Sequence, residues 1–93
     1  MLRVWGKLYS TVRMVRDAEC MDERTELAFD ERLESCLEEI VKELDLAKPI
    51  WFPANRDELA AFRKTAFRQD NFVEAFPYML FELEILETDD DEE

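Results

Sequence analysis

The residue types that usually perform catalysis are sparse in this chain of 93 residues. Histidine, the commonest general base and a frequent metal ligand, is absent. The single glycine, Gly6, lies in an alternating apolar segment, so the sequence contains no glycine-rich phosphate-binding loop. A Gly-x-Ser-x-Gly motif is also absent. Because the roles that an active site needs are not filled, we expect a protein that is not an enzyme.

The two cysteines form no metal-binding or redox motif, since the sequence has no Cys-x-x-Cys pair. Cys36 falls on an apolar helical stripe and is expected to be a small buried hydrophobic residue. Cys20 lies between Glu19 and Asp22, and neighbouring carboxylates should raise the pKa of its thiol and make it a poor nucleophile. The spacing leaves open whether the two cysteines form a disulfide, although nothing in the sequence indicates a secreted protein.

Carboxylates are abundant, but their spacing does not match a calcium-binding loop. Neither Asp22-Glu23 nor the run 89–93 has the twelve-residue ligand spacing or the glycine that such a loop needs at its turn. The remaining acids are expected on the solvent side of a helix, where ions are held only loosely. We therefore expect no metal ion and no other cofactor.

The charge of the chain is strongly negative and uneven. With 24 acidic and 12 basic residues, the formal net charge is −12. Residues 1–16 and 48–73 are net basic, whereas residues 17–47 and 74–93 each carry a net charge of −9. This balance disfavours non-specific binding to nucleic acid or to an anionic membrane. It favours a basic protein as the partner.

The N-terminal residues predict a β-hairpin. Residues 2–9 alternate apolar and polar side chains, as in a half-buried strand. A tight turn at Ser10-Thr11 then leads into a second strand over residues 12–16. Residues 17–24 have few apolar side chains, and we expect them to form a loop.

The central residues predict one long amphipathic helix over about 26–46. Asp22 or Thr25 is the expected N-cap, and Lys48-Pro49 is the expected end. Apolar side chains recur at three- and four-residue steps, which makes one continuous stripe. The stripe consists of Phe29, Leu33, Cys36, Leu37, Ile40, Val41 and Leu44. Because Leu37 and Ile40 lie in its middle, we expect both in the centre of the core.

The second half of the chain is less regular. Residues 50–52 are expected to plug the core or to form a brief strand, and a shorter helix should begin at Ala54 or Asn55. The side chains expected to turn toward the core are Leu59, Ala60 and Phe62. Residues 65–72 fit either a strand or a helix, whereas residues 78–86 alternate as a strand.

These elements predict an α+β fold. We expect an antiparallel sheet of three to four strands, with one long amphipathic helix and a shorter second helix packed on one face. The last strand should pair with the hairpin, where its acids would oppose Arg3, Lys7 or Arg13. Residues 1–87 then form a single domain, and residues 88–93 form an acidic disordered tail.

These features favour a non-catalytic interaction protein that presents an acidic surface to a basic protein partner, either by simple charge attraction or as a mimic of nucleic acid. No apolar run approaches the roughly 20 residues of a membrane span, and the first residues lack a signal-peptide core. We therefore expect a cytoplasmic protein without membrane contact. The expected partner-binding residues are Glu31, Glu34, Glu38, Glu39, Glu43, Asp89, Asp90 and Asp91.

Two alternatives remain open. The first is a structural homodimer that buries surplus aromatic surface, namely Trp51, Phe52, Phe76 and Tyr78. The second is weak binding of single-stranded nucleic acid, because basic and aromatic residues interleave as in a stacking platform. The basic residues are Arg63, Lys64 and Arg68, and the aromatic ones are Phe62, Phe67 and Phe72.

Three segments, residues 2–9, 46–51 and 64–72, carry a resemblance that extends over most of the chain. Together with the strand at 78–86 and the acidic end, they resemble a small uncharacterised family of acidic proteins from anaerobic Gram-positive bacteria. The resemblance implies a bacterial, cytoplasmic, stand-alone protein and brings no active site with it. It also favours a strand over a helix in the stretch that ends at Phe72.

Overall fold

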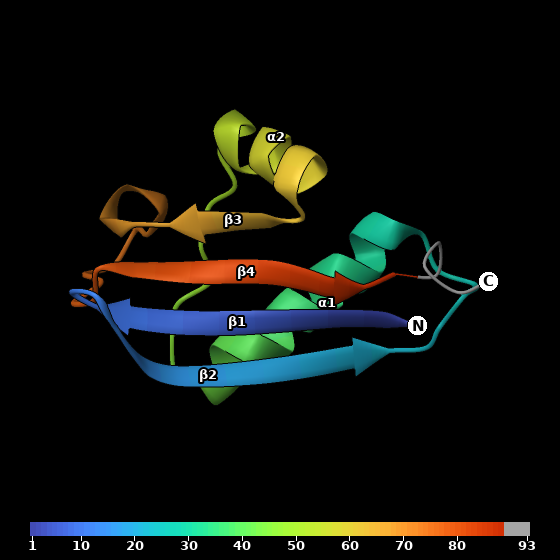
Figure 1. Ribbon diagram of the computed structural model, residues 1–93, viewed down its shortest axis with the longest axis horizontal. Coiled ribbons are helices and arrows are strands. Elements are labelled where there is room, and N and C mark those ends of the chain that lie inside the picture. The colour runs from blue at the N-terminus through green and yellow to red at the C-terminus, as the bar shows by residue number, and fades with distance from the viewer. Residues whose placement is uncertain (89–93) are drawn as a thin grey trace.

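One antiparallel sheet of four strands, in the order β2-β1-β4-β3, forms the framework of the protein in the computed structural model. Two helices pack against this sheet, which confirms the predicted α+β fold (Figure 1). The strands are β1 (Leu2–Ser10), β2 (Arg13–Asp22), β3 (Lys64–Phe67) and β4 (Leu80–Glu87). The helices are α1 (Phe29–Glu43) and α2 (Pro53–Phe62), and a 3-10 turn, η1 (Gln69–Asn71), follows β3.

The structure describes residues 1–88. Of the predicted tail, only Thr88 falls within this range, and residues 89–93 lie outside the described residues. No helix in the described part of the chain is long and apolar enough to cross a membrane.

The central strand β1 directs alternate side chains to the helix-covered face, as its sequence pattern predicts. Leu2, Val4 and Leu8 are almost completely buried there. Gly6 lies in the same row, opposite Ala18 of β2 and Leu83 of β4. The missing side chain at this point lets α1 come close to the sheet.

The β2 strand is longer than predicted, because residues 17–22 continue it instead of forming a loop. Its helix-facing positions carry the small residues Ala18 and Cys20, which give a weak apolar signal. On the opposite face, Asp17 accepts a hydrogen bond from the Trp5 indole at 2.9 Å, and Glu19 pairs with Arg3 at 2.9 Å. Neighbours on β1 therefore satisfy the polar side chains that had suggested a loop.

The apolar stripe of α1 is buried as predicted, with Leu37 and Ile40 at its centre. Phe29 is the exception, because its side chain at the start of the helix is 42 % exposed. The predicted caps were wrong: the N-cap is Ala28, which makes no side-chain capping bond. Asp22 cannot serve as a cap because it ends β2.

The C-terminal end of α1 comes earlier than Lys48-Pro49. Leu44 caps the helix, and Asp45 adopts a positive φ of 58° that turns the chain away. The guanidinium of Arg16, which lies on β2, donates hydrogen bonds to the carbonyls of Glu43 and Leu44 at 3.0 and 3.2 Å. A cation on the neighbouring strand thus satisfies the last carbonyls of the helix.

Residues 50–52 form no strand, and they are held instead by η1. The Asn71 amide donates to the carbonyl of Ile50 at 2.8 Å, and the backbone N–H of Ile50 donates to the carbonyl of Asn71 at 2.6 Å. In α2, Leu59 faces the core, but Ala60 and Phe62 are exposed, so the predicted core face was wrong for both.

The ambiguous segment 65–72 contains the short strand β3, followed by η1. The β4 strand covers most of the predicted range and pairs with β1, as expected. Lys7 and Arg3 do face acids of β4, at Glu82 and Glu87. Arg13 has no acidic partner among the described residues.

A methyl group at position 6 should destabilise the fold. In Gly6→Ala, the new Cβ would overlap Ile40 Cγ2 and lie 2.8 Å from Phe81 Cε1. We expect a loss of about 1–3 kcal/mol in the free energy of unfolding, measured by urea denaturation. In an Ile40→Ala background, Gly6→Ala should lower the free energy of unfolding by less, because the clashing Cγ2 atom of Ile40 is absent. Equal costs in both backgrounds would contradict the close approach of α1.

Candidate functional site

The outward side of α1 carries six carboxylates, and we call this set the acidic face. It consists of Asp30, Glu31, Glu34, Glu38, Glu39 and Glu43. All are exposed except Glu34, which is half-buried. Lys42 is the one exposed basic residue of the helix, because Arg32 is buried. All five glutamates that the sequence predicted for partner binding therefore lie on one element.

The acidic face has two flanks, one on each side of a line that runs along the outward side of α1. On one flank, a shallow hollow is lined by Asp30, Glu31, Glu34, Ser35 and Glu38. On the other flank, Glu39, Glu43 and the basic Lys42 line a second hollow together with Glu19 of β2. The second hollow thus connects the helix to the sheet, where Arg3 neutralises Glu19. The remaining predicted residues, Asp89, Asp90 and Asp91, lie outside the described residues.

Lys48 partly neutralises the first flank. Its ammonium pairs with Glu34 and lies 3.5 Å from Glu38. The hydrogen bond with Glu34 is the main cause that raises the pKa of Lys48 above its usual value. Glu31 and Glu43, by contrast, pair with no cation among the described residues. Both flanks are therefore partly neutralised, the first by Lys48 and the second by Lys42 and the Arg3–Glu19 pair. Glu31 and Glu43, toward the two ends of the helix, carry the most available charge.

Lys7 lies on the sheet face that the helices do not cover, yet it is only 8 % exposed. Its ammonium contacts Glu82 and Glu84, each at 2.7 Å, and lies 4.1 Å from the centre of the Trp5 ring. Burial alone would lower the pKa of Lys7, but the hydrogen bonds to both glutamates outweigh it and raise the pKa. The side chain is therefore an ammonium that joins β1 to β4, not an amine nucleophile.

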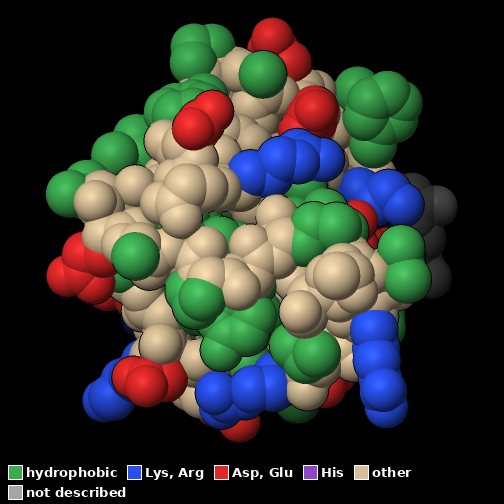
Figure 2. All heavy atoms as spheres, turned by 90° about the vertical axis from the view of Figure 1, so that its left-hand side faces the viewer, with side chains coloured by type: hydrophobic (Ala, Val, Ile, Leu, Met, Phe, Trp, Pro, Cys, Tyr) green, Lys and Arg blue, Asp and Glu red, His purple; other side chains and the backbone are tan. Residues whose placement is uncertain are grey.

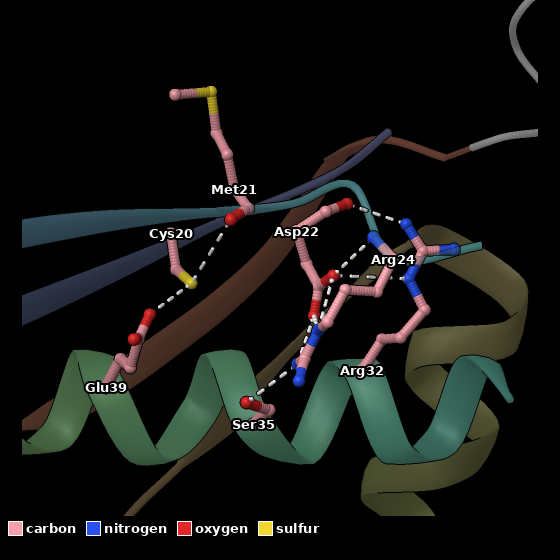
Figure 3. A network of polar contacts seen from close by, with 7 residues as sticks. All are labelled: Cys20, Met21, Asp22, Arg24, Arg32, Ser35 and Glu39. Atoms are coloured by element: carbon pink, nitrogen blue, oxygen red, sulfur yellow. Dashed lines mark hydrogen bonds and ion pairs between the residues drawn. The ribbon is translucent and has the colours of Figure 1, made fainter. Parts of the chain in front are cut away.

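A second charge cluster, in which Asp22 and Arg32 are buried and Arg24 is exposed, joins the end of β2 to α1. Figure 3 shows Asp22 directed toward α1, with Arg24 and Arg32 beside it. Arg24 donates to the Asp22 carboxylate at 2.6 Å and also to Ser35 at 3.1 Å. Arg32 donates to the backbone carbonyl of Asp22 at 2.6 Å. The hydrogen bond from Arg24 outweighs desolvation and lowers the pKa of Asp22 to about 2.

The two thiols lie beside this cluster and are both reduced and buried. Cys20 donates to the Glu39 carboxylate at 2.8 Å (Figure 3). Burial is the main cause that raises the pKa of the Cys20 thiol, with contributions from Cys36 and Glu39. Burial also raises the pKa of Cys36. The predicted direction for Cys20 is confirmed, but its cause is burial rather than the loop acids.

No metal centre forms from these groups. Within residues 1–88, no three cysteine or acidic side chains lie together in an arrangement that could hold a metal ion. The Cys20–Glu39 contact is a thiol–carboxylate hydrogen bond with no third ligand beside it.

The structure separates the basic and aromatic residues that had suggested a nucleic-acid platform. Phe67 and Phe72 are buried, so only Phe62 of the three rings is exposed. The side chains of Arg63, Lys64 and Arg68 remain exposed beside it. A stacking platform needs exposed aromatic faces next to its cations, and here two of the three faces are used in the core.

Most of the aromatic surface that suggested a homodimer is also used within the chain. Phe76 stacks on Phe72 with ring centroids 4.2 Å apart, and Trp51 and Tyr78 pack against the core. Phe52 remains 38 % exposed. At the end of the molecule formed by the hairpin turn, hydrophobic side chains are scattered among basic, acidic and neutral ones (Figure 2). This one face therefore offers no continuous apolar patch of the kind that a stable dimer buries.

Comparison with protein-family models, with curated proteins and with solved structures found no match. The resemblance to acidic proteins of anaerobic bacteria therefore stays a prediction.

Sequence reasoning missed the Asp22 cluster. The available signal was Arg32 itself, which falls four residues before Cys36 and three after Phe29, at the edge of the apolar stripe. A basic residue at such a position needs a carboxylate partner within the fold.

Removing the Asp22 charge should change how stability depends on pH. Because the folded pKa lies near 2, below the usual 3.8, the carboxylate stabilises the fold above about pH 4 and loses this effect as the pH falls toward 2. We expect Asp22→Asn to be less stable than the parent protein near neutral pH and the difference to shrink below about pH 4. Urea unfolding across this range measures it. Glu31→Gln, which changes an exposed acid, should show no such convergence.

The thiols should react slowly in the folded protein. Both have raised pKa values and are buried, so few thiolates are available to alkylating reagents at mildly alkaline pH. We expect iodoacetamide labelling, followed by mass spectrometry, to be slow in buffer and rapid in concentrated urea. The variant Cys36→Ser isolates the rate of Cys20. Rapid labelling of that folded variant would contradict the burial of Cys20.

Proposed function

We propose that this protein is a non-catalytic binding protein whose α1 acidic face docks on a basic region of another protein. The observation that carries this proposal is the concentration of five exposed carboxylates and one half-buried carboxylate on a single helix. The helix itself is held rigidly, because its opposite side forms the core. A rigid element presents its charges in a fixed pattern, which favours recognition over diffuse attraction.

The flank that includes Glu19 supports the same proposal. Glu39 and Glu43 line a hollow with Glu19 of the neighbouring strand β2, where Lys42 and Arg3 partly neutralise the negative charge. A basic partner could therefore contact both the helix and the sheet edge. Such a surface accelerates encounter with a positively charged patch, and the acceleration falls as salt screens the charges.

Several features argue against an enzymatic role for the same region. Lys7 is held as an ammonium, both thiols have raised pKa values, and Asp22 is locked between two arginines. The titratable groups with perturbed environments are therefore engaged with one another within the fold. Lys7 joins β1 to β4, and Asp22 and Cys20 join β2 to α1, as expected for structural contacts rather than catalytic groups.

The proposal predicts that charge on α1 matters more than equal charge elsewhere. We use decalysine as the probe and Glu31→Gln/Glu38→Gln/Glu43→Gln as the test variant. In low salt its affinity should fall at least fivefold relative to the parent, measured by fluorescence anisotropy of labelled decalysine. Near physiological salt the difference should narrow, because screening weakens every exposed charge.

The matched control is Asp57→Asn/Asp70→Asn/Glu74→Gln, which removes the same formal charge from exposed positions outside α1. We expect it to weaken binding much less than the α1 variant does. If both variants weaken binding equally, the probe responds to net charge alone, and the acidic face is not a docking site.

A further inference from the structure

The two cysteines lie on opposite sides of the interface between β2 and α1. Cys20 is on the helix-covered face of β2 and 8 % exposed, and Cys36 is on the sheet-facing stripe of α1 and 1 % exposed. Figure 3 shows the Cys20 side chain directed toward α1, where its thiol contacts Glu39. Glu39 follows Cys36 by three residues, and residues at this spacing are neighbours on a helix. Cys20 therefore lies within one helical turn of Cys36.

Two contacts of other residues fix how α1 lies along β2. The guanidinium of Arg32 donates to the backbone carbonyl of Asp22 at 2.6 Å. Eight residues further along α1, Ile40 lies directly over Gly6, where an added Cβ would overlap its Cγ2 atom. Gly6 pairs with Ala18 of β2. The helix therefore runs along the strand from position 22 toward position 18.

This register places the two cysteines opposite each other. Cys20 lies midway between positions 22 and 18 of β2, and Cys36 lies midway between positions 32 and 40 of α1. Two residues of a strand span about 6.6 Å and four residues of a helix span about 6 Å, so the two spacings match. After burial, the Cys36 thiol is the largest cause of the raised pKa of Cys20, as this alignment requires.

The short distance between α1 and the sheet suits a covalent bond between the two elements. A disulfide joins Cα atoms that are usually about 4.4–6.8 Å apart. Cα atoms of α1 and β2 come within 8 Å of each other. The overlap that a Cβ at Gly6 would make with Ile40 shows how closely the helix approaches, one turn away from Cys36.

We infer that Cys20 and Cys36 are a reversible thiol–disulfide pair, which locks β2 to α1 under oxidising conditions and opens under reducing ones. The oxidant is a small disulfide of the glutathione type. One cysteine attacks it and releases the first glutathione, and the other cysteine then attacks the mixed disulfide and releases the second. Two cysteine thiols are thereby oxidised, one glutathione disulfide is reduced, and the two thiol protons end on the two glutathione sulfurs. The lock does not depend on the acidic face or on a basic protein partner.

The test compares the equilibrium of this bond in the folded and the unfolded chain, because burial slows the first attack and makes the rate uninformative. The full chain is brought to equilibrium from both the reduced and the oxidised side in mixtures of oxidised and reduced glutathione, then quenched with acid and weighed by mass spectrometry. We expect the disulfide to form at least tenfold more favourably in buffer than in concentrated urea, because the fold holds the thiols together. By linkage, the oxidised protein should unfold at a higher urea concentration. A disulfide that forms equally or less favourably in buffer overturns the inference.

The matched control moves one thiol to the other face of the sheet. Cys20→Ala/Met21→Cys places it at an exposed position one residue further along β2, with almost the same length of chain to Cys36. In urea this variant should form its disulfide as readily as the parent, and in buffer at least tenfold less readily. Equal formation in buffer would show that the alignment plays no part and would overturn the inference.

Peptide mapping identifies the bond that forms. In the oxidised parent protein we expect a peptide pair joined through Cys20 and Cys36 within one chain. Cys20→Ala and Cys36→Ala should each abolish this product, so that the result does not depend on the folding of one variant. Disulfides between two chains, in place of the internal bond, would overturn the inference.

Discussion

The close approach of α1 to the sheet at Gly6 is the constraint on which the rest of the fold depends. Ile40 reaches into the space where a side chain at position 6 would otherwise lie, and Phe81 fills the other side. This contact sets the distance between helix and sheet in the middle of the core. Because α1 lies close to the sheet, Cys36 and Leu37 are buried against it. The same short distance allows the Arg32 side chain to reach the end of β2.

The short distance between α1 and the sheet also determines which charged side chains contact one another. It brings Asp22 between the exposed Arg24 and the buried Arg32 and thereby joins three charged residues in one cluster at the protein surface. On the uncovered sheet face, Lys7 is enclosed in the same way by two glutamates and an indole ring. Buried ion pairs add little net stability, but leaving one member without its partner is costly. These clusters therefore favour one strand register and one helix position over alternatives.

The sequence predicted the helices and strands correctly wherever apolar side chains recur on one face of the element. The alternation in residues 2–9, the stripe from Leu33 to Leu44 and the strand at 78–86 were all recognisable, and so was the pairing of the first and last strands. The β2 strand was underestimated because Asp17 and Glu19 find their partners on β1, which only the folded register reveals. Five of the six carboxylates of the acidic face were predicted to lie on the solvent side of α1, and Asp30 was not. The pairing of Lys48 with Glu34 depends on how the chain turns after the helix, and no local pattern encodes it.

The position of β2 at the edge of the sheet has a consequence for solubility. Within residues 1–88, no strand lies beside its outer backbone groups, and an open edge of ten residues favours pairing with another chain. Continuing the sheet with a second β2 would bring two copies of α1 together along the flank that holds Glu39 and Glu43. The resulting like-charge contact opposes such pairing. The carboxylates proposed to contact a basic partner thus also oppose aggregation through the β2 edge. The other edge strand, β3, is only four residues long and lies beside α2 (Figure 1).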